Sequence, residues 1–142
     1  MTIKVSIDAS GGDHGIPVTI AAGIKALGSF KDLQLTFVGD QSLIEAELNS
    51  HPAANKLLSR IQVVHATEVV LMNEPPAIAL RKKKNSSMRV AINLVKSTDV
   101  DACVSAGNTG ALMAISRFVL KTIKGIDRPA IMGRMPTMTG HT

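Results

Sequence analysis

Apolar and polar residues follow two different periods along this chain. A period of two over Ile3–Ile7 predicts a strand that ends at Asp8, and the apolar face of Ile20, Ile24 and Leu27 predicts a helix from residue 17 to 28. The same patterns predict further strands and helices downstream. The further strands are residues 33–38, 61–64, 102–104 and 130–132, and the further helices are residues 42–49, 77–83, 88–95 and 109–120.

This alternation of strands and helices predicts an α/β protein, with a mainly parallel sheet and helices on both faces. Pro75 and Pro76 predict irregular structure over residues 68–76. In a parallel sheet, ligands bind at the carboxyl ends of the strands, next to helix N-termini. Two loops of this chain directly follow predicted strands, and both are therefore candidate sites.

The first loop runs from Asp8 to Gly15. Its paired glycines, Gly11 and Gly12, let the backbone approach a ligand and turn N–H groups toward an anion. Three titratable side chains in this loop are candidates for moving a proton. They are Asp8, Asp13 and His14. The purely structural alternative is a glycine turn with two capping aspartates.

The second loop, Val104–Ala111, joins a predicted buried strand to an amphipathic helix. Free N–H groups at the start of that helix carry a partial positive charge and favour an anion. The candidate binding residues here are Ser105, Gly107, Asn108, Thr109 and Gly110. Ordinary capping of the helix by Asn108 or Thr109 is the structural alternative.

Charge is distributed unevenly along the chain. Residues 1–80 have five Lys/Arg and eight Asp/Glu (net −3), whereas residues 81–142 have eleven and three (net +8). This asymmetry favours an anionic partner for the second half. A nucleic acid is excluded as the partner because the chain has no Trp or Tyr and only three Phe for base stacking. Phosphate, an acidic carrier protein and an anionic membrane surface remain.

The densest positive charge is at Arg81–Lys84. Such a run is commonly a solvated helix face, and the functional alternative is that Arg81 or Lys82 reaches the phosphate. The single cysteine, Cys103, lies in an apolar run, which indicates a small buried side chain and excludes a disulfide framework or a cysteine metal cluster. We expect no metal and no cofactor. A strand pattern at the N-terminus and the lack of a long apolar run predict a cytoplasmic protein.

Both loops, together with Pro76–Met88, closely resemble the bacterial phosphate acyltransferases of phospholipid synthesis. The family opens with Asp-Ala-Met-Gly-Gly-Asp-x-Gly-Pro, and here Ser10 replaces the Met and Ile16 the Pro. Val104–Met113 matches the family signature, and Asp127–Ala130 fits as well. The resemblance covers essentially the whole chain. Family members are much longer, so residues 1–142 are expected to be the N-terminal part of one α/β catalytic domain.

This resemblance implies an acyltransferase that makes acyl-phosphate from a fatty acyl-acyl-carrier-protein thioester and inorganic phosphate, for glycerophospholipid synthesis. It also implies a fold akin to the isocitrate and isopropylmalate dehydrogenases, a homodimer, and a loose association with the inner face of the membrane. Phosphate would be held by Ser105–Gly110, with Asp8, Asp13 or His14 as the base and Gly11 and Gly12 at the oxyanion.

Two other interpretations stay open. One is a phosphotransacetylase-like or dehydrogenase-like enzyme on a related fold. The other is a fragment that binds phosphate or a carrier protein without turnover, because half of the cleft would be absent.

Overall fold

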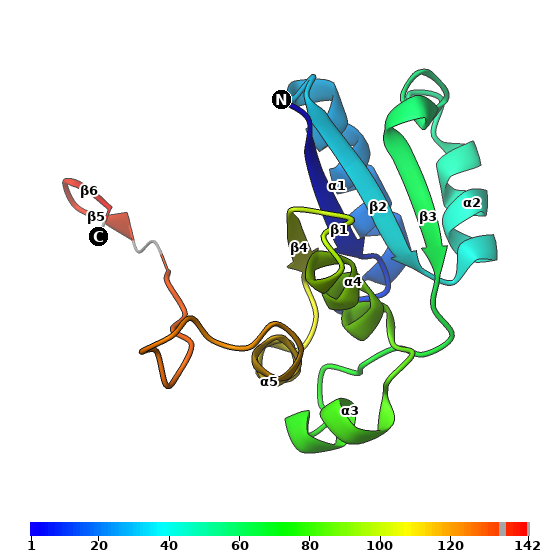
Figure 1. Cartoon of the computed structure of the whole chain (residues 1–142). Coiled ribbons are helices and arrows are strands. Elements are labelled where there is room, and N and C mark those ends of the chain that lie inside the picture. Colours follow the sequence, from blue (N-terminus) through cyan, green and yellow to red (C-terminus); the bar gives the residue numbers. More distant parts are fainter. Residues whose placement is uncertain (134–135, 142) are drawn as a thin grey trace.

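A four-stranded, all-parallel sheet with helices on both faces forms the body of the protein, and the predicted α/β class is confirmed (Figure 1). The computed structural model describes residues 1–133 and 136–141. In the sheet the strand order is β3-β2-β1-β4. Its strands are β1 (Ile3–Asp8), β2 (Leu33–Gly39), β3 (Ile61–His65) and β4 (Ala102–Ser105). The helices are α1 (Gly15–Ser29), α2 (Gln41–Ser50), α3 (Pro76–Lys82), α4 (Ser87–Lys96) and α5 (Thr109–Leu120).

Helices α1 and α2 cover one face of the sheet. Alternation along β2 turns Leu35 and Phe37 toward these helices, where they join Ile20 and Ile44 in the larger apolar core. Gly23 lets α1 approach the sheet closely, because a Cβ atom there would lie 2.5 Å from Phe37 Cζ. None of the helices in the described ranges has the length and apolar character needed to cross a membrane.

Helix α4 covers the opposite face, α5 packs on α4 beyond the edge of the sheet, and α3 packs on α5 (Figure 1). The Ser6 hydroxyl of β1 donates to the Ala91 carbonyl oxygen at 2.9 Å, which fixes α4 against the central strand. Met88 and Ile92 of α4 pack with Ile115 of α5 in a second apolar cluster. The starts of α4 and α5 are thereby held near the carboxyl ends of β1 and β4.

Two sequence predictions were wrong. Residues 130–132 form no strand, and the Ile131 and Met132 side chains are exposed. A short apolar run becomes a strand only when a neighbouring strand supplies its hydrogen bonds, and no such neighbour lies beside residues 130–132 in the described structure. Instead, a small hairpin joins β5 (Pro136–Thr137) and β6 (Gly140–His141). Pro76, expected in an irregular segment, is the first residue of α3, where its missing N–H group has no cost.

Candidate active site

The two glycine loops lie side by side at the carboxyl end of the sheet. In the parallel register of β1 and β4, Asp8 is the partner of Ser105, so both strands deliver their loops at the same level. A Cβ atom added to Gly11 would lie 3.1 Å from the Gly107 backbone nitrogen. Gly12 has a φ of +88°, and a Cβ atom there would lie 3.1 Å from the Ala106 carbonyl oxygen. Glycine is therefore required where the loops touch.

Asp8 is the central polar group between these loops. Its carboxyl is 1% exposed, and the Ser105 hydroxyl donates to Oδ2 at 2.7 Å. The Gly107 N–H group in turn donates to Ser105 Oγ at 3.1 Å, which links the carboxyl to the second loop. Burial raises the pKa of Asp8, and the nearby polar groups of Ser87, Ser105 and Gly11 oppose this effect. Asp8 therefore holds a proton more readily than an exposed aspartate does.

Replacing Gly11 by alanine is expected to destabilise the protein by about 1–3 kcal/mol. The added Cβ atom would lie 2.6 Å from Asp8 Oδ2, so the carboxyl or the loop must move. The matched control is Gly28→Ala in α1, where a Cβ atom meets nothing within 4 Å. This control should be stabilising by about 0.5–1 kcal/mol. Urea unfolding of both variants checks the result, and equal stabilities would contradict the close contact.

Asp13 and His14 are exposed and lie at the rim of the first loop. They line a cavity of about 230 Å³ with Gly12, Thr19 and Ala106, at the N-terminus of α1. His14 occupies the cap position of α1 without a capping hydrogen bond from its side chain. First-turn N–H groups of a helix have no partner within it, so this cavity suits a small anion. Among residues 1–133 and 136–141, no group of three His, Cys, Asp or Glu side chains is arranged for a metal ion.

Asn108, a candidate site residue, is held by hydrogen bonds at the start of α5. It is 8% exposed, and its Oδ1 atom accepts from the Ala111 N–H group at 3.0 Å, which caps α5. Its Nδ2 atom donates to the carbonyl oxygens of Leu71, Met72 and Glu74, at 3.2, 2.9 and 2.9 Å. With both amide atoms engaged in these bonds, Asn108 joins the 71–74 loop to the start of α5.

Thr109 and Gly110 begin α5 and are both exposed. A Cβ atom on Gly110 would lie 2.8 Å from Pro76 Cγ, so this glycine permits the close packing of α3 and α5. Arg81 and Lys82 are exposed on the last turn of α3. Within the described part of the chain, no hydrogen bond or ion pair joins them to either loop.

Positive charge gathers instead at the C-terminal part of α5. Arg89 and Lys121 lie over the Phe118 ring, at 5.3 and 4.9 Å from its centroid. A hollow of about 430 Å³ next to this ring is lined by Leu80, Ala114, Arg117, Phe118, Lys121 and Thr122. We call Arg89, Arg117, Phe118 and Lys121 the basic surface. Among the residues that the structure describes, no acidic side chain lines the hollow.

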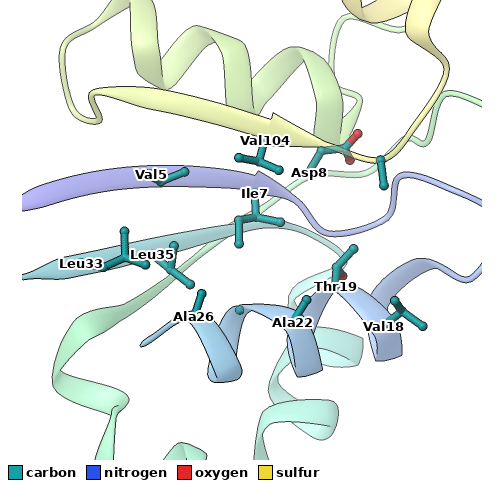
Figure 2. A pocket seen from close by; sticks show the side chains of 12 residues that line it. Val5, Ile7, Asp8, Val18, Thr19, Ala22, Ala26, Leu33, Leu35 and Val104 are labelled. Atoms are coloured by element: carbon teal, nitrogen blue, oxygen red, sulfur yellow. The ribbon is translucent and has the colours of Figure 1, made fainter. Parts of the chain in front are cut away.

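An apolar groove lies beside the loops, between α1 and the strands β1 and β4 (Figure 2). It has a volume of about 410 Å³, and its walls are almost entirely apolar, with Val5, Ile7, Leu35 and Val104 from the strands. Ala106, Val18 and Thr19 line both this groove and the cavity at the first loop. The groove therefore opens toward the candidate anion site.

Sequence reasoning missed one polar residue of the site. Ser87 was not among the residues predicted for the site, yet it is 1% exposed at the first position of α4 and lies near Asp8. Its distance of 79 positions from Asp8 in the sequence left no local signal. Cys103 of β4 also lies near Asp8, and burial raises the pKa of its thiol to about 11, so it stays protonated.

The chain is similar in sequence to known proteins. The chain is 78% identical over 142 residues to the phosphate acyltransferase of Ruthia magnifica subsp. Calyptogena magnifica. The matched region covers all of this chain and 42% of that protein. It is 57% identical over 141 residues to the phosphate acyltransferase of Hydrogenovibrio crunogenus, covering 99% of this chain and 41% of that protein. The predicted resemblance to phosphate acyltransferases is therefore confirmed.

The chain spans about two fifths of the length of these curated relatives. The family model described as fatty acid synthesis protein matches residues 3–142. Because this match covers nearly every residue, the chain belongs to the fatty acid synthesis protein family.

Proposed function

We propose that this protein transfers a fatty acyl group from a carrier-protein thioester to inorganic phosphate and so forms acyl-phosphate. The observation that carries the proposal is the buried Asp8 carboxyl between two touching glycine loops, beside an anion-sized cavity. The names of the relatives supply the reaction class, since both are phosphate acyltransferases.

In the proposed reaction, a phosphate oxygen attacks the thioester carbonyl carbon and forms a tetrahedral intermediate. The C–S bond then breaks, and the carrier thiol leaves with the electron pair of that bond and takes up a proton. Phosphate is already anionic, so the main task of the protein is to hold it about 3–3.5 Å from the carbonyl carbon. The backbone N–H groups of Gly12 and of residues 108–110 supply the donors, because those of Gly11 and Gly107 already bond to the Asp8 carbonyl oxygen and to Ser105 Oγ.

Asp8 is the proposed general base, in preference to Asp13 or His14. Its burial raises its pKa, which brings a carboxyl closer to the range useful for proton transfer. The half-buried Ser105 hydroxyl connects Asp8 Oδ2 to the second loop, so the phosphate proton would pass to Asp8 through Ser105. No acyl-enzyme is needed, which agrees with the protonated state of the Cys103 thiol.

The apolar groove supports an acyl substrate. Its walls come from α1, β1 and β4, and it opens toward the loops through Ala106, so an acyl chain lying there would present its carbonyl at the loop. Burying such a chain contributes about 0.8 kcal/mol per CH₂ group.

The basic surface supports an acidic carrier protein as the acyl donor. Its cations lie around a hollow, and a hollow fits a protruding acidic element of a protein better than a flat lipid surface. We expect Lys121→Glu to raise the KM for the acyl-carrier substrate about tenfold and to leave kcat unchanged. The control is Lys25→Glu, with the same charge change on exposed α1. Equal KM values for the two variants would exclude the basic surface from docking.

The test of the reaction uses the 142-residue chain alone and a chimera in which it replaces the corresponding segment of the Ruthia magnifica relative. Release of free thiol from palmitoyl-carrier protein is followed with and without phosphate. Phosphate-dependent release by the chimera, with acyl-phosphate as the product, is expected. The chain alone is expected to bind phosphate without turnover. Turnover of acetyl-coenzyme A, or NAD reduction, would favour the related-fold alternatives instead.

A further inference from the structure

Two buried polar atoms near the centre of the site have no hydrogen-bond partner among the described residues. They are Asp8 Oδ1 and Ser87 Oγ, and both side chains are 1% exposed. A buried polar atom without a partner destabilises the folded state, because it has lost its hydrogen bonds to water. Because two such atoms lie on facing elements, we expect them to take part in a specific interaction.

The backbone brings these two residues to the same place. Asp8 lies two residues after Ser6 on one face of β1, and Ser87 lies one helical turn before Ala91 on one face of α4. The hydrogen bond from Ser6 Oγ to the Ala91 carbonyl oxygen sets this alignment at 2.9 Å. It places Ser87 over Asp8.

Ser87 is also held from its other side. Its N–H group donates to the Glu68 carbonyl oxygen at 3.0 Å. Next to it, Met88 packs under the second loop, because a Cβ atom on Gly107 would lie 3.0 Å from Met88 Cε. The first turn of α4 is thus fixed between the sheet, the 66–74 segment and the second glycine loop.

We propose that Ser87 is a positioning residue, whose hydroxyl group is the partner of Asp8 Oδ1 and holds the carboxyl with its Oδ2 atom toward Ser105. The inference rests on the proposed role of Asp8 in the reaction, but the contact itself can be tested without turnover. When Asp8 is ionised, Ser87 donates to Oδ1. When Asp8 takes up a proton from Ser105, that proton lies on Oδ2, and Oδ1 still accepts from the Ser87 hydroxyl.

Few other groups act on this carboxyl. From β4, the Cys103 thiol interacts with Asp8 and stays protonated, because burial raises its pKa to about 11. From α4, the Arg89 guanidinium lies over the Phe118 ring, and Lys96 is at the far end of the helix. The groups that oppose the effect of burial on the Asp8 pKa are the hydroxyls of Ser87 and Ser105 and, from the first loop, the Gly11 backbone.

The test measures the ionisation of Asp8 in the 142-residue chain by carbon-13 NMR of labelled aspartate carboxyls. Ser87→Ala is expected to make Asp8 a roughly tenfold weaker acid, since it loses a hydrogen bond to the charged form. Ser87→Thr keeps the hydroxyl and should restore the titration of the parent chain. An unchanged Asp8 titration in Ser87→Ala, with a shifted titration in Ser105→Ala, would overturn the proposal.

The matched control is Ser86→Ala. Ser86 is also buried, caps α4 by accepting from the Arg89 N–H group at 3.3 Å, and donates to the Lys83 carbonyl oxygen at 2.8 Å. This variant should lower stability through the lost cap and leave the Asp8 titration unchanged. An equal change of the titration in Ser86→Ala would show that loosening of α4, and not the Ser87 hydroxyl, sets the ionisation, and would also overturn the proposal. In the chimera, Ser87→Ala should shift the pH profile of kcat. A loss of all turnover in the unsubstituted chimera would count against the proposed function alone.

Discussion

Asp8→Asn in the chimera is expected to lower kcat for phosphate-dependent acyl transfer by about 10²–10⁴-fold, the usual contribution of a general base. Asparagine has nearly the shape of aspartate but cannot take up the phosphate proton at neutral pH. Initial rates at saturating phosphate and acyl-carrier concentrations measure the effect. Asp13→Asn and His14→Gln are the controls, and their exposed side chains should leave most of the rate intact. If kcat falls strongly in either control while the Asp8→Asn variant stays active, the general base is Asp13 or His14 at the rim of the loop.

The same substitution has a second expected result, in stability. The pKa of Asp8 is raised above its ordinary value of 3.8, so the folded protein binds this proton more tightly than the unfolded chain does. The stability that this carboxyl contributes is complete below pH 3.8. It declines as pH rises to the raised pKa and is constant above it. The Asp8→Asn variant should lack this decline. Its free energy of unfolding should therefore rise relative to that of the parent chain as the pH increases from 3.8 to the raised pKa. Urea unfolding at a series of pH values measures the difference, and parallel pH curves would contradict the raised pKa.

Asn108→Ala is expected to destabilise the protein by at least about 2 kcal/mol. The change removes the cap of α5, at about 1 kcal/mol, and leaves three partly buried carbonyl oxygens of the 71–74 loop without their donor. Asn108→Ser keeps a capping oxygen and loses the amide donor, so the difference between the two variants isolates the cap. Urea unfolding gives both free energies.

The control for this prediction is Asn93→Ala on the exposed face of α4, which should change stability by no more than about 0.5 kcal/mol. If Asn108→Ala were as stable as the parent chain, the clamp onto the 71–74 loop would contribute nothing. If Asn108→Ala instead raised the KM for phosphate in the chimera without lowering stability, Asn108 would be a phosphate-binding residue.

Much of the fold was readable from local patterns. Alternation over Ile3–Ile7 and the apolar stripe of Ile20, Ile24 and Leu27 located β1 and α1, because burial on one face requires those periods. Helix boundaries were harder to predict. The segment with Pro75 and Pro76 looked irregular, but proline is compatible with the first turn of a helix.

The glycine loops were also visible in the sequence, since strand order and loop composition are local properties. Their roles were not separable there. Asp8, Asp13 and His14 stand in one loop with the same apparent chemistry, and only burial distinguishes Asp8 from the exposed pair. Asn108 looked like a ligand-binding amide, and only its contacts with the 71–74 loop show it as a clamp.

The sequence by itself thus determined the α/β class, the two candidate loops and the family, because these depend on periodicity, composition and order along the chain. The tertiary structure alone decided which groups meet. The β1–β4 register set Ser105 beside Asp8, and the packing of α4 on β1 brought Ser87 over the same carboxyl. The reason is physical: burial and hydrogen bonding, which change the acidity of a carboxyl, come from neighbours that are about 80 to 100 positions away.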